Sequence, residues 1–224
     1  MLVVTETLPA AVLWDMDGTI VDTEPYWIAA ELALVEAYGG TWSEEEALTL
    51  VGQGLPFSAR ILQSKGVDLA AEEIILSLTA RVLEQVRVAV PWRPGARELL
   101  AALREAGIRT ALVTMSWRVL AEYIASRIDG GFDVIVTGDE VSNAKPHPEP
   151  YLRAAVLLNV NPRDCIAIED SRPGVASAVA AEVVTIGVPH VIALDPSPAY
   201  TLWPTLEGRT VADLATLIAE SRVP

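Results

Sequence analysis

Five short apolar runs, with helical patterns between the last four, are the feature that most constrains the fold. Each run is apolar at consecutive positions, which is typical of a strand buried on both faces of a parallel sheet. The runs are Ala11–Trp14, Thr110–Thr114, Val134–Thr137, Cys165–Ile168 and Val183–Ile186. Strands that alternate with helices form βαβ units with right-handed crossovers. The sequence therefore predicts an α/β fold with an open parallel sheet.

The stretch between the first and the second run is far too long for one crossover. Residues 22–90 lie in it, and their pattern is mostly helical. The ranges with helical spacing are Glu31–Tyr38, Glu44–Val51 and Asp68–Arg87. We therefore expect a small inserted helical domain at residues 22–90, and a sheet domain built from residues 1–21 and 91–224.

Composition excludes several classes of partner and site. The chain has 16 basic and 30 acidic residues, a formal net charge of −14, so we expect no nucleic acid and no membrane partner. A single cysteine, Cys165, excludes an internal disulfide and a cysteine-cluster metal site. No segment reaches the length of a membrane span without a charge or a proline, and residues 1–14 lack the basic start of a signal peptide. We therefore expect a cytoplasmic protein.

Acidic residues follow the first predicted strand, at the edge where ligands bind in open parallel sheets. Asp15 and Asp17 are two positions apart, so both carboxylates can point the same way. Gly18 beside them permits a sharp turn and the close approach of a ligand. The alternative is an ordinary loop that happens to be acidic.

Two further segments suit a phosphate group. Thr114, Met115 and Ser116 follow the second strand at the expected start of a helix, where hydroxyl and backbone N–H groups can bind phosphate. The alternative is that Ser116 only caps that helix. Lys145, one of two lysines in the chain, lies among prolines that stiffen its backbone, so its ammonium can neutralise a phosphoryl group. A solvated surface lysine is the alternative.

A pair of carboxylates, Glu169 and Asp170, follows the fourth strand. Adjacent carboxylates at the end of a buried strand repel each other unless a cation is present. Mg²⁺ prefers oxygen ligands of this kind and takes one or two carboxylates. The pair indicates a magnesium site, and the alternative is that Asp170 caps the next helix.

Taken together, these segments resemble the motifs of the haloacid dehalogenase (HAD) superfamily, in its phosphatase branch. The matching segments are DMDGT at 15–19, Thr114 after ALV, KPHPEPY at 145–151 and IEDSRPGV at 168–175. The resemblance covers almost the whole chain and is closest to the β-phosphoglucomutase-like phosphatases. It implies a Rossmann-like open parallel sheet core with a small inserted helical cap domain, and we therefore call residues 22–90 the cap.

The resemblance also implies roles for the matching residues. Asp15 is the nucleophile that becomes an aspartyl-phosphate, and Asp17 is first the general acid and then the general base. The implied cofactor, Mg²⁺, is held by the Asp15 carboxylate, the Asp17 backbone carbonyl and Asp170. The residues implied to bind the phosphoryl group or to support the set are Gly18, Thr114, Met115, Ser116, Lys145 and Glu169.

These roles imply a Mg²⁺-dependent phosphatase that hydrolyses a small phosphomonoester, and we expect a sugar phosphate. A β-phosphoglucomutase-type mutase is the alternative, although the histidine at the start of that family's cap is replaced here by Tyr26-Trp27. A dehalogenase needs neither Asp17 nor Asp170, and a binding module needs no nucleophile, so both are disfavoured. The residues expected to line the substrate pocket are Glu24, Trp27, Gln53 and Trp117. The oligomeric state cannot be read from the sequence.

Overall fold

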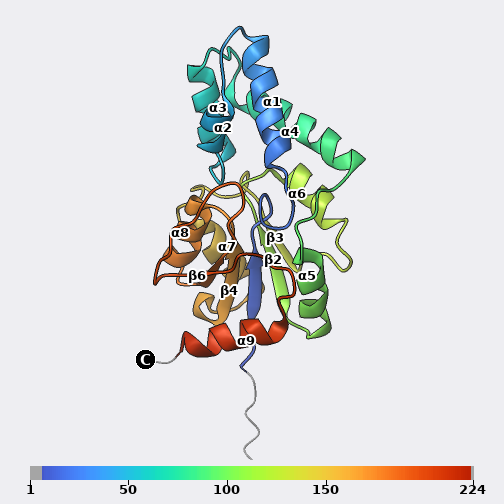
Figure 1. The fold of residues 1–224 in the computed structure, drawn as a ribbon, viewed down its shortest axis with the longest axis vertical. Helices are drawn as coiled ribbons and strands as arrows, with labels where there is room; N and C mark the ends of the chain where they lie inside the picture. The colour runs from blue at the N-terminus through green and yellow to red at the C-terminus, as the bar shows by residue number, and fades with distance from the viewer. Residues whose placement is uncertain (1–6, 223–224) are drawn as a thin grey trace, which may run out of the picture.

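Six parallel strands form one open sheet in the computed structural model, which describes residues 7–222 (Figure 1). Their order across the sheet is β3-β2-β1-β4-β5-β6. The strands are β1 (Ala11–Trp14), β2 (Arg109–Val113), β3 (Val134–Val136), β4 (Cys165–Glu169), β5 (Val184–Gly187) and β6 (Thr201–Leu202). The predicted α/β class and the first five strands are confirmed to within about one residue at each end. The two-residue β6 carries no apolar run, and the sequence did not predict it.

Alternate residues of the central strand β1 supply two separate cores. Val12 and Trp14 face α5 (Ala96–Glu105) and α9 (Val211–Glu220), in one large apolar cluster. Leu13 points to the other face, where it packs with α7 (Glu149–Leu158) and α8 (Arg172–Ala180). Because both faces are covered by helices, the strand is apolar at every position, as a buried parallel strand must be.

The cap contains α1 (Glu24–Ala37), α2 (Glu44–Leu48), α3 (Leu55–Ser64) and α4 (Ala71–Val88), which lie above the ends of the strands in Figure 1. The first helix begins seven residues before the predicted Glu31. Its second residue is Pro25, and a proline is tolerated in the first turn because its missing N–H would have no partner there. The helix α3 was not predicted. Within residues 7–222, no helix is long and apolar enough to cross a bilayer.

Two antiparallel connections join the cap to the sheet domain. Asp22 N donates to Pro91 O (2.8 Å), and Arg93 N donates to Ile20 O (2.9 Å). Val21 and Trp92 form a bridge between them. The chain therefore leaves the sheet domain and returns to it at one place.

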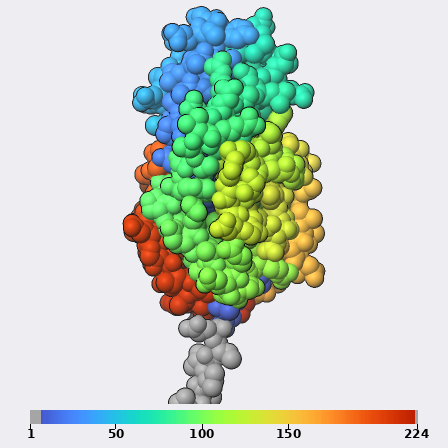
Figure 2. All heavy atoms as spheres, turned by 90° about the vertical axis from the view of Figure 1, so that its right-hand side faces the viewer, coloured from blue at the N-terminus to red at the C-terminus, as the bar shows by residue number. Residues whose placement is uncertain are grey.

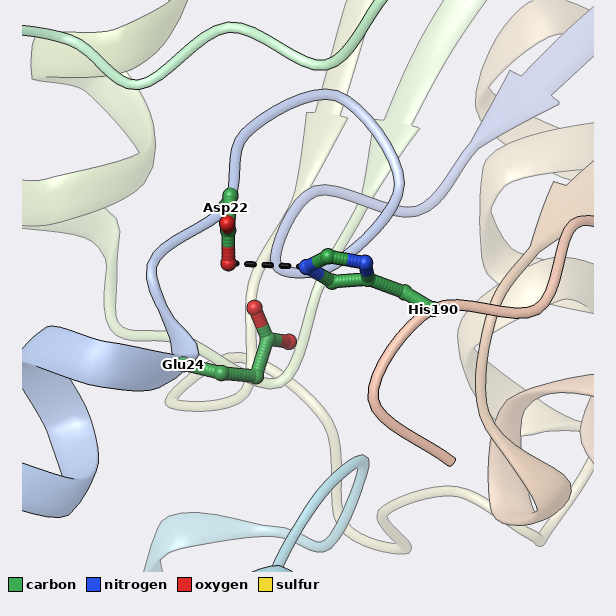
Figure 3. Close-up of side chains that lie close together, drawn as sticks. All are labelled: Asp22, Glu24 and His190. Atoms are coloured by element: carbon green, nitrogen blue, oxygen red, sulfur yellow. Dashed lines mark ion pairs between the residues drawn. The ribbon is translucent and has the colours of Figure 1, made fainter. Parts of the chain in front are cut away.

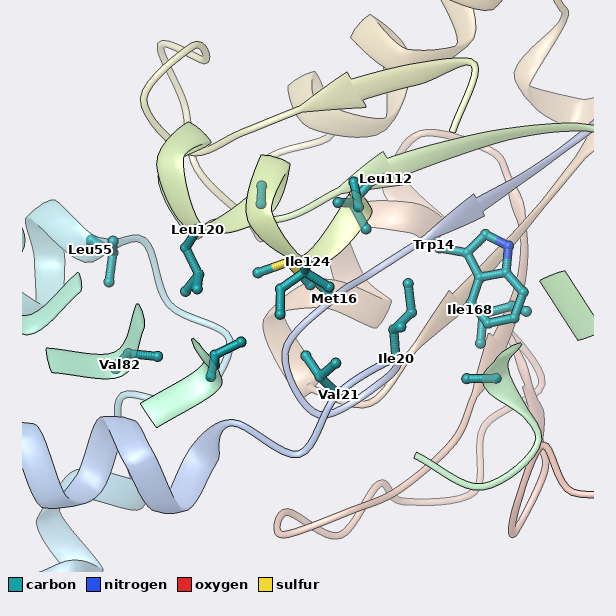
Figure 4. Packing of buried hydrophobic residues seen from close by; sticks show 14 of the residues in the cluster. Trp14, Met16, Ile20, Val21, Leu55, Val82, Leu112, Leu120, Ile124 and Ile168 are labelled. Carbon is teal, nitrogen blue, oxygen red and sulfur yellow. The ribbon is translucent and has the colours of Figure 1, made fainter. Parts of the chain in front are cut away.

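Apolar packing continues from the sheet into the cap. Leu55 of α3 and Val82 of α4 belong to the same buried cluster as Leu120 of α6 (Arg118–Ala125) and Met16 beyond β1 (Figure 4). In the space-filling view, the end of α4 meets the segment that follows β2, and the cap and the sheet domain form one elongated body (Figure 2). The cap is thus seated on α6 by the same hydrophobic effect that stabilises the core.

Candidate active site

A pocket lies between the carboxyl ends of the central strands and the cap. Most residues singled out from the sequence line it. They are Asp15, Asp17, Glu24, Trp27, Gln53, Thr114, Met115, Ser116, Lys145 and Asp170. Parallel strands end at the same edge of the sheet, and this brings together segments that are more than 150 residues apart in the chain.

Lys145 is the centre of a buried ion cluster. Its Nζ donates to Asp15 Oδ1 (2.7 Å), Glu169 Oε1 (2.6 Å) and the backbone oxygen of Val113 (2.9 Å). These three bonds use all three donors of an ammonium group. Burial lowers the pKa of Lys145, but the two carboxylates outweigh it, so the net shift is upward and the ammonium stays charged. The alternative of a solvated surface lysine is therefore wrong.

Both carboxylate oxygens of Glu169 accept hydrogen bonds from other side chains. Besides Lys145, Tyr151 donates its hydroxyl to Oε1 (2.6 Å), and Ser171 donates to Oε2 (3.3 Å). Burial, together with the neighbouring carboxylates, raises the pKa of Tyr151 well above its usual value, so the phenol keeps its proton and remains a donor. The sequence analysis did not assign a role to Tyr151 or Ser171. Tyr151 was nevertheless present in the quoted segment KPHPEPY.

Asp15 and Asp170 differ from Glu169 because each keeps a free oxygen. Oδ2 of both residues is buried and has no hydrogen-bond partner among residues 7–222. Oxygens of Asp15, Glu169 and Asp170 lie within 4.8 Å of one another. Burial raises the pKa of Asp15 to about 7 and the pKa of Asp170 well above its ordinary value, with neighbouring carboxylates adding to both shifts. The raised pKa values favour the protonated carboxyl groups, and a bound divalent cation would favour the carboxylates instead. These oxygen donors therefore fit Mg²⁺.

Gly18 allows the loop after β1 to approach Asp170. Its φ of +80° lies in the left-handed region, and a Cβ there would be 2.0 Å from Asp170 Oδ2 and 2.6 Å from Glu24 Oε1. Thr19 donates to the other oxygen, Asp170 Oδ1, at 3.5 Å. Only glycine fits this position without displacing the carboxylate that points at the candidate cation site.

Asp17 is bonded from the cap and from the sheet domain at once. Its Oδ1 accepts from Thr23 Oγ1 (2.5 Å) and Trp27 Nε1 (3.1 Å), which stand at the start of α1. Its Oδ2 accepts from Ser116 Oγ (2.7 Å) and Thr114 Oγ1 (3.3 Å) after β2. The orientation of this carboxylate therefore depends on the position of the cap, and Thr23 is a contact that the sequence analysis missed.

One prediction and two of the alternatives from the sequence analysis need correction. Trp117 was expected in the pocket, but it is the N-cap of α6 and packs half-buried against the apolar cluster. It is not among the residues that line the pocket. Ser116 is accordingly not the N-cap of α6. The N-cap of α8 is Ser171 rather than Asp170, so the oxygens of Asp170 stay available.

A second group of ionisable side chains lies beside the connections to the cap (Figure 3). His190 Nε2 is 2.8 Å from Asp22 Oδ1, and Glu24 lies next to this pair. Arg93 contacts His190 Nδ1. These contacts tie the segment after β5 to the connections between the cap and the sheet domain.

Glu31 is a buried carboxylate in the cap that the sequence analysis missed. It lines the pocket, is 5% exposed and accepts a hydrogen bond on Oε2 from Trp42 Nε1 (3.1 Å). Burial raises the pKa of Glu31 to about 7. A local signal was present, because Glu31 is the one charged residue in the otherwise apolar stretch 27–35 of α1.

Comparison with known proteins identifies the family. The family model described as haloacid dehalogenase-like hydrolase matches residues 9–182. The chain belongs to this family. It is 30% identical over 191 residues to hexitol phosphatase B of Escherichia coli (strain K12), across 80% of this chain and 83% of that one. It is 34% identical over 187 residues to the phosphorylated carbohydrates phosphatase of Thermotoga maritima, across 80% and 85% of the two chains.

A solved structure extends the comparison to a bound ligand. A mutant of CbbY from Rhodobacter sphaeroides in complex with xylulose-(1,5)bisphosphate superimposes with a TM-score of 0.82 at 28% identity, covering 90% of this chain and 96% of that one. With the family match and the phosphatase relatives, this chain is a HAD-type phosphoric monoester hydrolase.

Replacing Gly18 with alanine should abolish most activity. The new Cβ would displace Asp170 Oδ2, and a shift of about 1 Å in a reacting site can cost roughly a hundredfold. Gly39→Ala is the matched control, since its φ of +74° imposes similar backbone strain but no atom lies within 4 Å of the added carbon. Measured kcat/KM should fall at least about 100-fold for Gly18→Ala and stay near the starting value for Gly39→Ala. Equal losses in both variants would contradict this account.

Replacing Glu31 with glutamine should stabilise the fold in a pH-dependent way. The pKa of Glu31 rises from 4.5 to about 7 on folding, so the folded state holds its proton more tightly and loses stability as pH rises through this window. The free energy of unfolding of the variant should exceed that of the unmodified protein by roughly 3 kcal/mol at pH 8 and by less than about 1 kcal/mol at pH 5. Urea unfolding at the two pH values measures the difference. A gain independent of pH would show that Glu31 carries no such cost.

Proposed function

We propose that this chain is a Mg²⁺-dependent phosphatase that hydrolyses a small phosphomonoester, a sugar phosphate, through an aspartyl-phosphate intermediate. The observation that carries the proposal is the free, buried Oδ2 of Asp15, whose other oxygen is fixed by Lys145. A nucleophile, an ammonium and a second aspartate, Asp17, face one pocket. The names of the relatives hexitol phosphatase B and phosphorylated carbohydrates phosphatase support a phosphorylated carbohydrate as the substrate.

Asp15, Asp170 and the backbone carbonyl of Asp17 would hold the Mg²⁺ ion. The free Oδ2 atoms of the two aspartates support this assignment, and Glu169 acts as their support because its own oxygens are bonded. Bound there, Mg²⁺ would supply positive charge that reduces the repulsion between a carboxylate and an anionic phosphate ester.

In the first step, Asp15 attacks phosphorus and the ester P–O bond breaks. Asp17 gives its proton to the departing oxygen. Lys145 remains beside the transferring group as a fixed charge. The hydroxyls of Thr114 and Ser116 reach the same space and can bind the phosphoryl oxygens once the substrate displaces them from Asp17.

In the second step, water attacks the aspartyl-phosphate, and Asp17 takes up the proton of that water. The bond between phosphorus and Asp15 breaks, and inorganic phosphate leaves. One residue serves both steps because the proton given in the first is recovered in the second. Its bonds to Thr23 and Trp27 let the cap orient Asp17 for both steps.

The domain boundaries belong to this proposal. Residues 22–90 form the cap, and residues 1–21 with 91–224 form the catalytic core. The paired connections at Asp22 with Pro91, and at Ile20 with Arg93, support boundaries at these points. Closure of the cap would exclude bulk water during the first step. The mutase alternative is not better supported than the phosphatase.

Conservative replacement of the two aspartates after β1 should separate their roles. Asp15→Asn removes the nucleophile and should leave no measurable phosphate release. Asp17→Asn keeps the nucleophile and should slow turnover by roughly a hundred- to ten-thousand-fold. With a good leaving group, Asp17→Asn should also accumulate acid-labile phosphoenzyme, detectable by mass spectrometry. Substantial activity in Asp15→Asn would refute the assigned nucleophile.

Removal of divalent cations should stop the reaction. EDTA should reduce phosphate release to background, and added Mg²⁺ should restore it. Asp170→Asn should raise the Mg²⁺ concentration needed for half-maximal activity by roughly tenfold or more, because it replaces a carboxylate ligand with a weaker amide. Asp68→Asn, on the exposed surface of the cap, is the control. Unchanged turnover in metal-free buffer would refute the assignment of these residues as Mg²⁺ ligands.

A further inference from the structure

We infer that Glu31 selects the substrate by accepting hydrogen bonds from hydroxyl groups at the end of the substrate that carries no phosphate. The preferred substrate is then a polyol or sugar that carries one phosphate, and a second anionic group at the far end is rejected. This inference rests on the phosphatase function proposed above and adds the substrate class to it.

The charges that line the pocket favour one phosphate over two. Apart from Lys145, no lysine or arginine among residues 7–222 lines it, and the three donors of Lys145 are already bonded. On the cap side, the carboxyl group of Glu31 lines the pocket. A second phosphate placed there would lose its hydration, meet no cation and lie beside the Glu31 carboxyl group.

The cations of the cap near the pocket are engaged elsewhere. Arg60 is exposed and lies over the ring of Phe57, beside a different groove. Lys65 forms an ion pair with Glu46 (2.5 Å) and stands 5.7 Å from the ring centroid of Trp42. Neither side chain lines the pocket. The distal part of the site therefore suits a neutral group.

Glu31 has the geometry of a fixed acceptor. Trp42 Nε1 donates to Oε2 at 3.1 Å, and no described residue makes a hydrogen bond to Oε1. A carboxylate can accept several hydrogen bonds, so capacity remains for substrate hydroxyls. Gln53 and Ser58 also line this side of the pocket and supply neutral polar groups.

Burial makes this acceptor selective. A site built to bond a hydroxyl rejects an analogue that lacks it, because the buried protein group is then left unpaired. The raised pKa of Glu31 shows that folding keeps this carboxyl buried at a cost in stability. Groups retained at such a cost are concentrated at functional sites.

The test compares four phosphorylated compounds as substrates of the full-length enzyme with Mg²⁺. Glucitol 6-phosphate and glucose 6-phosphate carry distal hydroxyls, fructose 1,6-bisphosphate carries a second phosphate, and acetyl phosphate has no distal part. The first two should have the highest kcat/KM among compounds with a sugar or polyol chain. Equal use of the bisphosphate would overturn the inference.

Glu31→Gln is the main variant, and Glu36→Gln, exposed on the same helix, is its matched control. Glu31→Gln should lower kcat/KM for the polyol and sugar monophosphates by roughly 10- to 100-fold, mainly through KM. Turnover of acetyl phosphate should stay within about twofold, and the preference for one phosphate over two should shrink. Glu36→Gln should change none of these values.

Trp42→Phe tests the same idea without touching the acceptor. It removes the N–H that holds Glu31, so the same substrates should lose kcat/KM, by a smaller factor. If Glu31→Gln and Trp42→Phe leave the ranking of substrates unchanged, or lower all four activities equally, the inference is wrong. If the unmodified enzyme releases phosphate from none of the four compounds, the proposed function itself fails.

Discussion

The structure of the site depends on one buried ammonium. Lys145 places its positive charge between Asp15 and Glu169 and bonds to the backbone where β2 ends. Without it, closely spaced carboxylates at the ends of β1 and β4 would have to take up protons or separate. Tyr151 completes the arrangement because its phenol donates a second hydrogen bond to Glu169 Oε1. The chemistry proposed for Asp15 thus rests on contacts made behind it.

A second constraint couples the cap to the proposed acid and base. Asp17 receives hydrogen bonds from Thr23 and Trp27 on the cap side and from Ser116 on the sheet side. The cap is also held by the apolar cluster that it shares with α6. A movement of the cap must therefore change both the packing of this cluster and the orientation of Asp17. This links the exclusion of water to the delivery of a proton.

On the cap side of the pocket, one acidic residue acquires a role in the choice of substrate that the acidic composition alone does not indicate. A net charge of −14 indicates no particular ligand. In the pocket, however, Glu31 is buried, and the hydrogen bond from Trp42 fixes its direction. A carboxyl group in this setting attracts hydrogen-bond donors and repels a second phosphate. The same residue type on the surface, such as Glu36, does neither.

The sequence alone determined the sheet and the residues at its edge, since a buried parallel strand must be apolar throughout and its ligands must follow it. Asp15, Asp17 and Asp170 were predictable for that reason. By residue type and position Glu169 and Asp170 are equivalent, and the family resemblance alone gave them different roles. Only the tertiary structure supplies the physical reason: Lys145 and Tyr151 bond to Glu169, whereas Asp170 Oδ2 has no partner among residues 7–222. Contacts of this kind depend on how the elements pack, and this holds even for the bond from Trp42 to Glu31, which are 11 residues apart. The spacing of residues along the chain does not reveal them.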